Sequence, residues 1–328
     1  MTVPERVIHG RYRVIYAIDD TAGVIVSCCR DEQTAALVTV AEWANISAEQ
    51  RDALATTASH LQTLNISGLC PIIAILNNES GFTAVAQAPH AHTLGQSLRM
   101  RNGAMSEAEV VQQTLRLLHI LQAFHTAKPA LYLNVPTLAD ILIPDDGQWV
   151  LLPFVALRRL GTEASAYRAP ELAQTPTATP ASDVYGLAAL AFHASTGVPP
   201  LSMEQIAQGA RFITPRTHVP SLSDMWEAVL IRGLQDKPSN RYQHASEMQA
   251  ALQTMAILGS SATSTEQTLP AALPSQGTAE SAEGTMLPSN VLPTEPPKEA
   301  VTSGSNMRLG CLVALAATLT IVAIMLCV

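Results

Sequence analysis

The sequence predicts an α+β fold, in which a strand-rich amino-terminal part precedes a larger helical part. Three stretches typical of β-strands come first, at residues 11–15, 24–26 and 36–40. Residues 107–125 then place apolar side chains at helical spacing, which indicates a long helix with one buried face. Residues 309–328 are apolar without a break and predict one transmembrane helix in addition to this fold.

Composition limits the classes of protein that need to be considered. The chain has 328 residues, 48% of them hydrophobic, which is enough for the core of one large domain or two lobes. Its net charge is −8 and no basic run occurs, so a nucleic-acid partner is not expected. The five cysteines include no CxxC pair, which argues against a structural zinc site and a disulfide framework and favours a reduced, cytosol-facing domain.

Three motifs in the second half of the chain resemble the carboxyl-terminal lobe of the protein-kinase superfamily, in particular the bacterial Ser/Thr kinases of eukaryotic type. Ala169-Pro170-Glu171 stands at the family's APE motif, and Asp183 at the aspartate that opens its central helix. Arg241 matches the late arginine that pairs with the APE glutamate. The resemblance implies two lobes, a small β-rich amino lobe at residues 8–90 and a helical carboxyl lobe at 91–256.

The same resemblance implies structural roles for these motif residues. Glu171 and Arg241 are expected to form a buried ion pair, which is costly to break on one side. Asp183 is expected to receive hydrogen bonds from the backbone of the loop that is catalytic in the family. Both roles support the fold and are independent of phosphoryl transfer.

The turn that would hold nucleotide phosphates has lost the glycines of the family. Residues 18–23 contain a single glycine, Gly23, which is the only candidate for a nucleotide contact there. A working loop uses glycines to bring backbone N–H groups close to the phosphates. Asp19 and Asp20 would instead repel a triphosphate, so the stretch is interpreted as an ordinary hairpin turn.

The lysine and glutamate that position the phosphates in the family are also absent. The best register places Thr39 at the lysine of the third strand, and no neighbouring residue is a lysine. In the following helix, at about residues 48–64, Thr57 takes the place of the glutamate. Both halves of the ion pair are therefore missing.

The positions of the catalytic base and of the metal ligands are substituted as well. Asp140 falls at the metal-binding asparagine, and counting back five residues gives Val135 at the catalytic aspartate. A different gap places Asn134 there, which cannot act as a carboxylate base. Pro153 replaces the magnesium-binding aspartate of the DFG triplet, and Ala164 the threonine of the substrate loop.

These losses predict a pseudokinase that is not an enzyme and acts as a signalling scaffold or allosteric partner, because the missing groups do chemistry while the remaining ones hold the fold. No cofactor is then expected. The alternative is an atypical but active kinase that transfers the γ-phosphate of ATP to Ser or Thr, with Mg²⁺ held by Asp140, Asp145 or Asp146. Residues 145–147 are interpreted first as a hairpin turn between two strands.

The end of the chain predicts attachment to a membrane. Residues 259–306 are rich in Ser, Thr, Pro and Ala and are expected to form a disordered linker. The helix at 309–328 follows it, and Lys298 and Arg308 precede the helix, which places the large domain on the cytoplasmic side. The expectation is a single-pass, carboxyl-terminally anchored protein of the plasma (inner) membrane.

The expected partners are cytosolic or membrane signalling proteins, for example an active kinase. A third interpretation makes the chain a membrane-anchored adapter whose linker is phosphorylated by another kinase. Thr265, Thr285 and Thr294 are the candidate sites.

Overall fold

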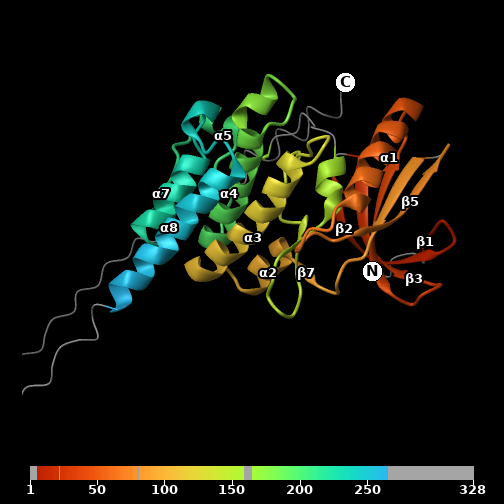
Figure 1. Cartoon of the computed structure of the whole chain (residues 1–328), viewed down its shortest axis with the longest axis horizontal. Coiled ribbons are helices and arrows are strands. Elements are labelled where there is room, and N and C mark those ends of the chain that lie inside the picture. The colour runs from red at the N-terminus through yellow and green to blue at the C-terminus, as the bar shows by residue number, and fades with distance from the viewer. Residues whose placement is uncertain (1–5, 22, 80, 159–164, 265–328) are drawn as a thin grey trace, which may run out of the picture. The chain divides into compact units, whose positions relative to one another are not determined.

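The computed structural model describes residues 6–21, 23–79, 81–158 and 165–264, all of which belong to one compact unit. Figure 1 shows a β-sheet with helix α1 at one end of this unit and a helical assembly at the other. Within the described residues, no helix is long and apolar enough to cross a membrane. The predicted transmembrane helix at 309–328 and the linker from residue 265 onward lie outside them.

The amino lobe is a six-stranded antiparallel sheet with one helix, as the strand-like stretches predict. Its strand order is β1-β2-β3-β4-β6-β5, and α1 packs on β5 and β6. The helix begins after Ser47, whose side chain accepts from the backbone N–H of Gln50 in a capping box. The elements are β1 Val7–Ile8, β2 Tyr12–Thr21, β3 Val24–Asp31, β4 Leu37–Ala44, α1 Ala48–Thr63, β5 Ile72–Asn78 and β6 Gly81–Ala86.

The carboxyl lobe is built around helix α4, in which every residue from 181 to 192 is buried. Helices α3, α7 and α8 all contact α4. A small sheet, β7-β8-β9, lies where this lobe begins. The α-helices are α2 Leu94–Met100, α3 Glu107–Thr126, α4 Pro180–Thr196, α5 Met203–Ala207, α6 Pro215–His218, α7 Asp224–Gly233 and α8 Ala245–Ser264. The remaining elements are β7 His92–Thr93, β8 Ile141–Ile143, β9 Val150–Leu151 and the 3-10 helices η1 Pro153–Leu157, η2 Pro170–Ala173 and η3 Pro238–Asn240.

One predicted boundary needs correction. The sequence places the start of the linker at residue 259, but α8 continues to Ser264. Residues 245–258 are dominated by Ala, Met, Gln and Leu, which are strong helix formers, and this helix carries on through Gly259. The turn predicted at residues 145–147 is present between β8 and β9, where Gly147 has a φ of +73°.

Candidate functional site

Asp183 organises the loop that stands at the catalytic loop of the family. Its carboxylate lies in the first turn of α4 and is buried. Oδ2 accepts from the backbone N–H of Leu133 at 3.0 Å and lies 3.0 Å from Nε2 of His125. Burial raises the pKa of Asp183, and the contacts with His125 and the Leu133 amide oppose that rise. The hydrogen bond that the resemblance implied is therefore present.

The loop next to Asp183 has an unusual backbone. Asn134 and Val135 have φ values of +47° and +67°, and a β-branched residue such as Val135 adopts the left-handed region only at a cost. Gly186 of α4 faces this loop, and a Cβ added there would lie 2.8 Å from Cδ of Pro136. Close packing on α4 thus keeps the loop in shape, although neither Asn134 nor Val135 carries a carboxylate.

Glu171 and Arg241 form the ion pair that the resemblance implied. Two parallel hydrogen bonds of 2.7 Å join the guanidinium to the carboxylate. The side chain of Arg241 is fully buried, and that of Glu171 is 24% exposed. Arg241 also donates to the backbone carbonyls of Gln235, Asp236 and Ala181. The pair joins η2, α4 and η3 within the carboxyl lobe.

The positions of the phosphate-gripping lysine and its glutamate carry neutral side chains. Thr39 of β4 is 2% exposed and lies opposite Cys28 and Ala86 in the sheet. Thr57 is half-buried on α1, where its hydroxyl donates to the carbonyl of Ala53 at 3.0 Å. Neither residue supplies a cation or an anion to the space between the lobes.

Pro153 begins η1, and all five residues of this 3-10 helix are buried. The ring of Phe154 packs edge-on against Trp43 of β4, with 6.4 Å between the ring centroids. The segment at the family's DFG triplet therefore fills space under the amino lobe with apolar side chains. It offers no carboxylate to a metal ion.

A charged cluster that the sequence did not reveal joins Asp140, Arg158 and Asp19. Nη1 of Arg158 donates to Oδ2 of Asp140 at 2.7 Å, and Nη2 donates to Oδ2 of Asp19 at 2.8 Å. Asp140 precedes β8 in the carboxyl lobe, whereas Asp19 lies on β2 in the amino lobe. One guanidinium thus connects the carboxylate at the metal-ligand position with a carboxylate beside the phosphate-loop turn.

Asp140 is held from several sides. Its side chain is 1% exposed, and Oδ2 also accepts from the backbone N–H and the hydroxyl of Thr137, at 2.7 and 2.9 Å. Burial raises the pKa of Asp140, while Arg158 and the Thr137 hydrogen bonds lower it and Asp19 adds to the rise.

Asn134 anchors the backbone that carries Arg158. Its amide nitrogen donates to the carbonyl oxygens of Arg158 at 3.1 Å and of Ala156 at 3.4 Å. Asn134 and Asp140 stand at two catalytic-loop positions of the family, and both hold Arg158. This loop therefore has a structural use in the chain.

Comparisons with known proteins match this architecture. No family model matches the chain. A probable serine/threonine-protein kinase PknB from Bifidobacterium longum is 25% identical over 181 residues, which cover 49% of this chain. The kinase domain of PknI from Mycobacterium tuberculosis superposes with a TM-score of 0.61 at 17% identity, over 77% of this chain and 99% of that domain. The chain has the fold of the bacterial eukaryotic-type protein kinases.

A further structure of this fold is Rad53 1–466 in complex with AMP-PNP, at a TM-score of 0.61 and 18% identity, over 73% of this chain and 64% of that one. The matched part spans only about a quarter of the length of the PknB relative, 26%. At these identities the solved structures establish the kinase fold alone.

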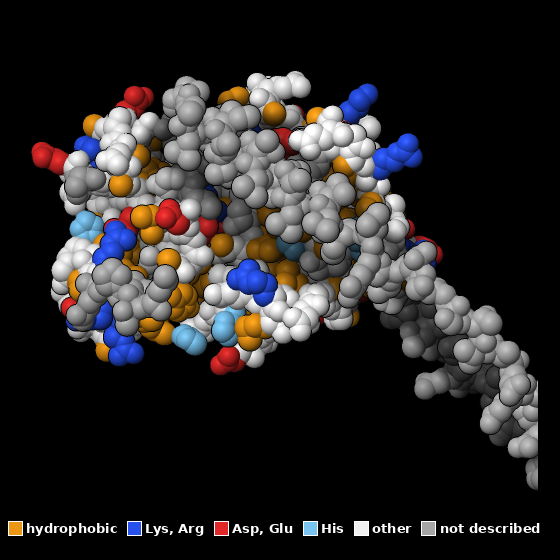
Figure 2. Space-filling model, turned by 180° about the vertical axis from the view of Figure 1, so that it is seen from behind, with side chains coloured by type: hydrophobic (Ala, Val, Ile, Leu, Met, Phe, Trp, Pro, Cys, Tyr) orange, Lys and Arg blue, Asp and Glu red, His pale blue; other side chains and the backbone are white. Residues whose placement is uncertain are grey.

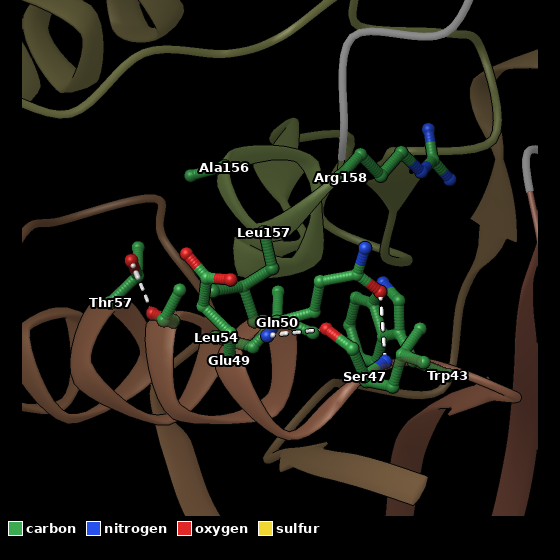
Figure 3. Close-up of a pocket in the computed structure, with 11 residues that line it drawn as sticks. Trp43, Ser47, Glu49, Gln50, Leu54, Thr57, Ala156, Leu157 and Arg158 are labelled. Atoms are coloured by element: carbon green, nitrogen blue, oxygen red, sulfur yellow. Dashed lines mark hydrogen bonds between the residues drawn. The ribbon is translucent and has the colours of Figure 1, made fainter.

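A pocket of about 400 Å³ lies between α1 and η1 of the kinase fold. Figure 3 shows Ser47, Glu49, Gln50, Leu54 and Thr57 on the α1 side, with Ala156 and Leu157 across from them. The side chain of Arg158 extends away from α1. The pocket therefore adjoins the charged cluster through Arg158, which lines it.

The residues of the cleft do not fit the Mg²⁺ and ATP that the kinase fold implies. Thr39 and Pro153 replace two of the family's phosphate and metal contacts, and Asp140 is already paired with Arg158. Among the described residues, no group of three or more His, Cys, Asp or Glu side chains could hold a metal ion. Gly23 has a φ of +74° and serves the β2–β3 turn.

Several predicted residues remain untested by the geometry. Asp145 and Asp146 lie in the β8–β9 turn, and Ala164 is outside the described residues. The linker threonines 265, 285 and 294 are outside them too.

Figure 2 shows one face of the molecule. In the part that the structure describes, the Lys and Arg side chains of this face lie singly or in small groups among neutral and hydrophobic ones. The absence of a nucleic-acid partner stays a prediction.

Sequence reasoning missed the role of Arg158 because Asp19 and Arg158 are 139 positions apart. One signal was available: Arg158 is the first cationic residue after Pro153, which stands at the metal-binding aspartate of the family.

Proposed function

We propose that this chain is a catalytically inactive, kinase-like domain that is tethered to the cytoplasmic face of the plasma membrane and acts as a scaffold or allosteric partner of signalling proteins, such as an active kinase. The observation that carries the proposal is the pairing of Arg158 with Asp19 and Asp140. The carboxylate at the metal-ligand position is neutralised by a cation of the chain itself. A kinase needs that carboxyl or amide group for Mg²⁺.

The other cleft residues support the proposal. Phosphoryl transfer depends on cations and hydrogen-bond donors that stabilise the transferring phosphate, and on a base for the substrate hydroxyl. Thr39 supplies no charge, and Val135 has no polar side chain. Asn134 donates its amide to two backbone carbonyls of the η1 segment. Asn134 and Asp140, which stand at two catalytic-loop positions of the family, are both engaged in contacts within the fold.

Nucleotide binding is the first property to measure. The full chain, kept in a mild detergent, is unfolded thermally with and without millimolar ATP and Mg²⁺, next to an active bacterial kinase. A ligand at 100 times its dissociation constant adds about 2.7 kcal/mol. A domain of this size gains about 2–4 °C in Tm for each kcal/mol. The expected result is a shift below about 1 °C for this chain and of several degrees for the active kinase.

Phosphoryl transfer is measured on the same samples, with autophosphorylation and a general protein substrate as readouts. No Mg²⁺-dependent transfer above background is expected. Transfer that is lost in the Asp140→Ala variant would contradict the proposal and establish an active kinase of unusual design.

Membrane tethering rests on the apolar stretch at 309–328. The full chain is expected to sediment with membranes and to resist extraction by high salt. A variant that lacks residues 309–328 is expected in the soluble fraction. Equal distribution of the two proteins would remove the tether from the proposal and leave the inactive domain in place.

A further inference from the structure

Arg158 is the point at which charged groups of the two lobes meet. Its guanidinium binds Asp19 of the amino-lobe sheet with one amino group and Asp140 of the carboxyl lobe with the other. The arginine itself follows η1, which contacts α1 of the amino lobe. Figure 3 shows its side chain reaching away from α1. A single side chain thus spans the cleft.

Burial makes this cluster different from a surface ion pair. The side chain of Arg158 is 5% exposed, that of Asp140 1% and that of Asp19 14%. Buried charges are only weakly screened by solvent and salt, and each needs its partners because an unpaired buried charge is unfavourable. Separating the lobes at this point would break the Arg158–Asp19 contact and leave the buried guanidinium with one carboxylate instead of two. The cluster therefore favours the arrangement of the lobes that the structure shows.

The cluster also resembles a metal site in its charge arrangement. Two carboxylates from different elements converge on one cation, as they do around a divalent metal ion with oxygen ligands. The cation here is a guanidinium, and its Nε is buried and makes no hydrogen bond within the described residues. Arg158 is therefore held by its two terminal amino groups, one for each carboxylate.

We propose that Arg158 is a built-in cation that takes the place of a divalent metal ion and clamps the two lobes together through Asp19 and Asp140. The cleft then stays closed with neither nucleotide nor metal, and release of Arg158 is the step that opens it. This inference rests on the proposed function, because an active kinase must leave Asp140 available to Mg²⁺. Once Arg158 is removed, the two carboxylates become ligands for a divalent cation.

The test measures the distance between the lobes in the full chain. Cysteines replace the exposed Glu79 in the amino lobe and Gln122 on α3, and both are labelled with nitroxides, in a background in which Cys311 and Cys327 are serine. Cys28, Cys29 and Cys70 are buried and stay in place. Double electron–electron resonance is expected to give one narrow distance distribution in the parent protein, unchanged by ATP and Mg²⁺.

Two variants weaken the clamp to different degrees. Arg158→Gln is expected to broaden the distribution and move it to longer distances. Asp19→Asn leaves the Arg158–Asp140 contact in place, so it is expected to fold even if Arg158→Gln does not, and to broaden the distribution to a smaller extent. Arg101→Gln is the matched control, because Arg101 pairs with Glu109 on the surface of the carboxyl lobe. It is expected to leave the distribution unchanged.

Millimolar Mg²⁺ without nucleotide tests the replacement of a metal ion, because Mg²⁺ prefers oxygen ligands and is diamagnetic, so it leaves the nitroxide signal intact. It is expected to narrow the distance distribution of Arg158→Gln and to raise the Tm of that variant by several degrees. It is not expected to change either quantity in the parent protein or in the double variant Arg158→Gln, Asp140→Asn. No response of Arg158→Gln to Mg²⁺ would overturn the proposal that the arginine replaces a metal ion.

The outcomes separate this inference from the proposed function. Unchanged lobe distances in both Asp19→Asn and Arg158→Gln would overturn the clamp. Lobe distances carry no information on catalysis, so this result would not affect the proposal that the chain is an inactive scaffold. Phosphoryl transfer by the parent chain would overturn the proposed function directly.

Discussion

Arg241 and Arg158 are both buried and both pair with carboxylates, but the two guanidinium groups differ in the number and kind of their contacts. Arg241 makes two hydrogen bonds to Glu171 and three to backbone carbonyls, and its guanidinium lies over the ring of Tyr185. Arg158 makes one hydrogen bond to each of two carboxylates, and its Nε has no partner within the described residues. All contacts of Arg241 lie in one lobe, whereas those of Arg158 come from two.

This difference distinguishes a pair that holds one lobe together from a cluster that connects two lobes. The Glu171–Arg241 pair lies at motif positions of the kinase family, and it joins elements of a single lobe. The Arg158 cluster uses Asp140 from a catalytic-loop position and Asp19 from the phosphate-loop turn. Its stability therefore depends on the two lobes remaining together, and variants of the two clusters should respond differently.

The largest effect is expected from Glu171→Ala. This variant leaves the fully buried Arg241 without its carboxylate, and loss of one partner of a buried pair costs about 3–5 kcal/mol. Equilibrium unfolding in urea measures the change in the free energy of unfolding. Asp224→Asn, which removes an exposed partner of Arg216, is the control and should cost less than about 1 kcal/mol. Equal effects of the two variants would show that the backbone carbonyls alone satisfy Arg241.

The next largest effect is expected from Arg158→Gln, and it should depend on pH. Arg158 lowers the pKa of Asp140, so its removal lets burial raise that pKa further. A carboxyl whose pKa is higher in the folded than in the unfolded protein binds protons preferentially when folded. The stability of the variant therefore falls as the pH rises from about 4 through the folded pKa. The expected loss relative to the parent is about 3 kcal/mol at pH 8 and less at pH 5.

Urea unfolding at the two pH values checks this prediction, with Arg101→Gln as the control whose small cost should not change with pH. A loss in Arg158→Gln that grew toward pH 5 would contradict the assigned environment of Asp140.

A smaller effect is expected from Asp183→Ala. The Leu133 amide loses its buried acceptor and His125 its partner, and an unsatisfied buried group costs about 1–3 kcal/mol. Hydrogen exchange at the amide of Leu133 should become faster, while amides in α7 change only as far as global stability does. Asp183→Asn keeps one acceptor oxygen and should lose less. Unchanged protection at Leu133 would show that Asp183 does not hold the loop.

The smallest response is expected when the lost ion pair of the cleft is rebuilt. Thr39→Lys with Thr57→Glu restores the residue types of the family, but the Arg158 cluster remains. We expect a change in Tm with ATP and Mg²⁺ below about 1 °C. The same pair of substitutions in the Arg158→Gln background is the comparison. A clear ATP response of the first protein would show that the cluster does not block the nucleotide site.

The motif residues of the carboxyl lobe could be predicted because the sequence around them resembles motifs of the protein-kinase superfamily, and local signals in the structure agree with those motifs. Asp183 opens a helix with a Thr179 cap and a proline in its first turn, and Glu171 follows a proline that begins η2. The strands of the amino lobe were predicted from their β-branched residues. In the structure, Thr39 lies on β4, an inner strand of that sheet. These elements follow from local pattern together with a known arrangement.

The Arg158 cluster could not be predicted in the same way. Its three residues come from β2, from the loop before β8 and from the segment after η1, and no periodicity connects these places. Which carboxylates meet the guanidinium depends on how closely the two lobes approach, a tertiary property. The end of α8 was missed for a different reason. Gly259 and the following serines indicate a linker by composition, but the helix propagates past them.

An arginine that takes the place of a metal ion between two lobes makes the conformation of the domain independent of the supply of that ion. The conformation of an active kinase responds to the supply of ATP and free magnesium, which vary with the metabolic state of the cell. The cation at the Asp19–Asp140 site is covalently part of the chain, so its local concentration is fixed. A domain closed in this way presents the same surface to its partners in starved and growing cells alike.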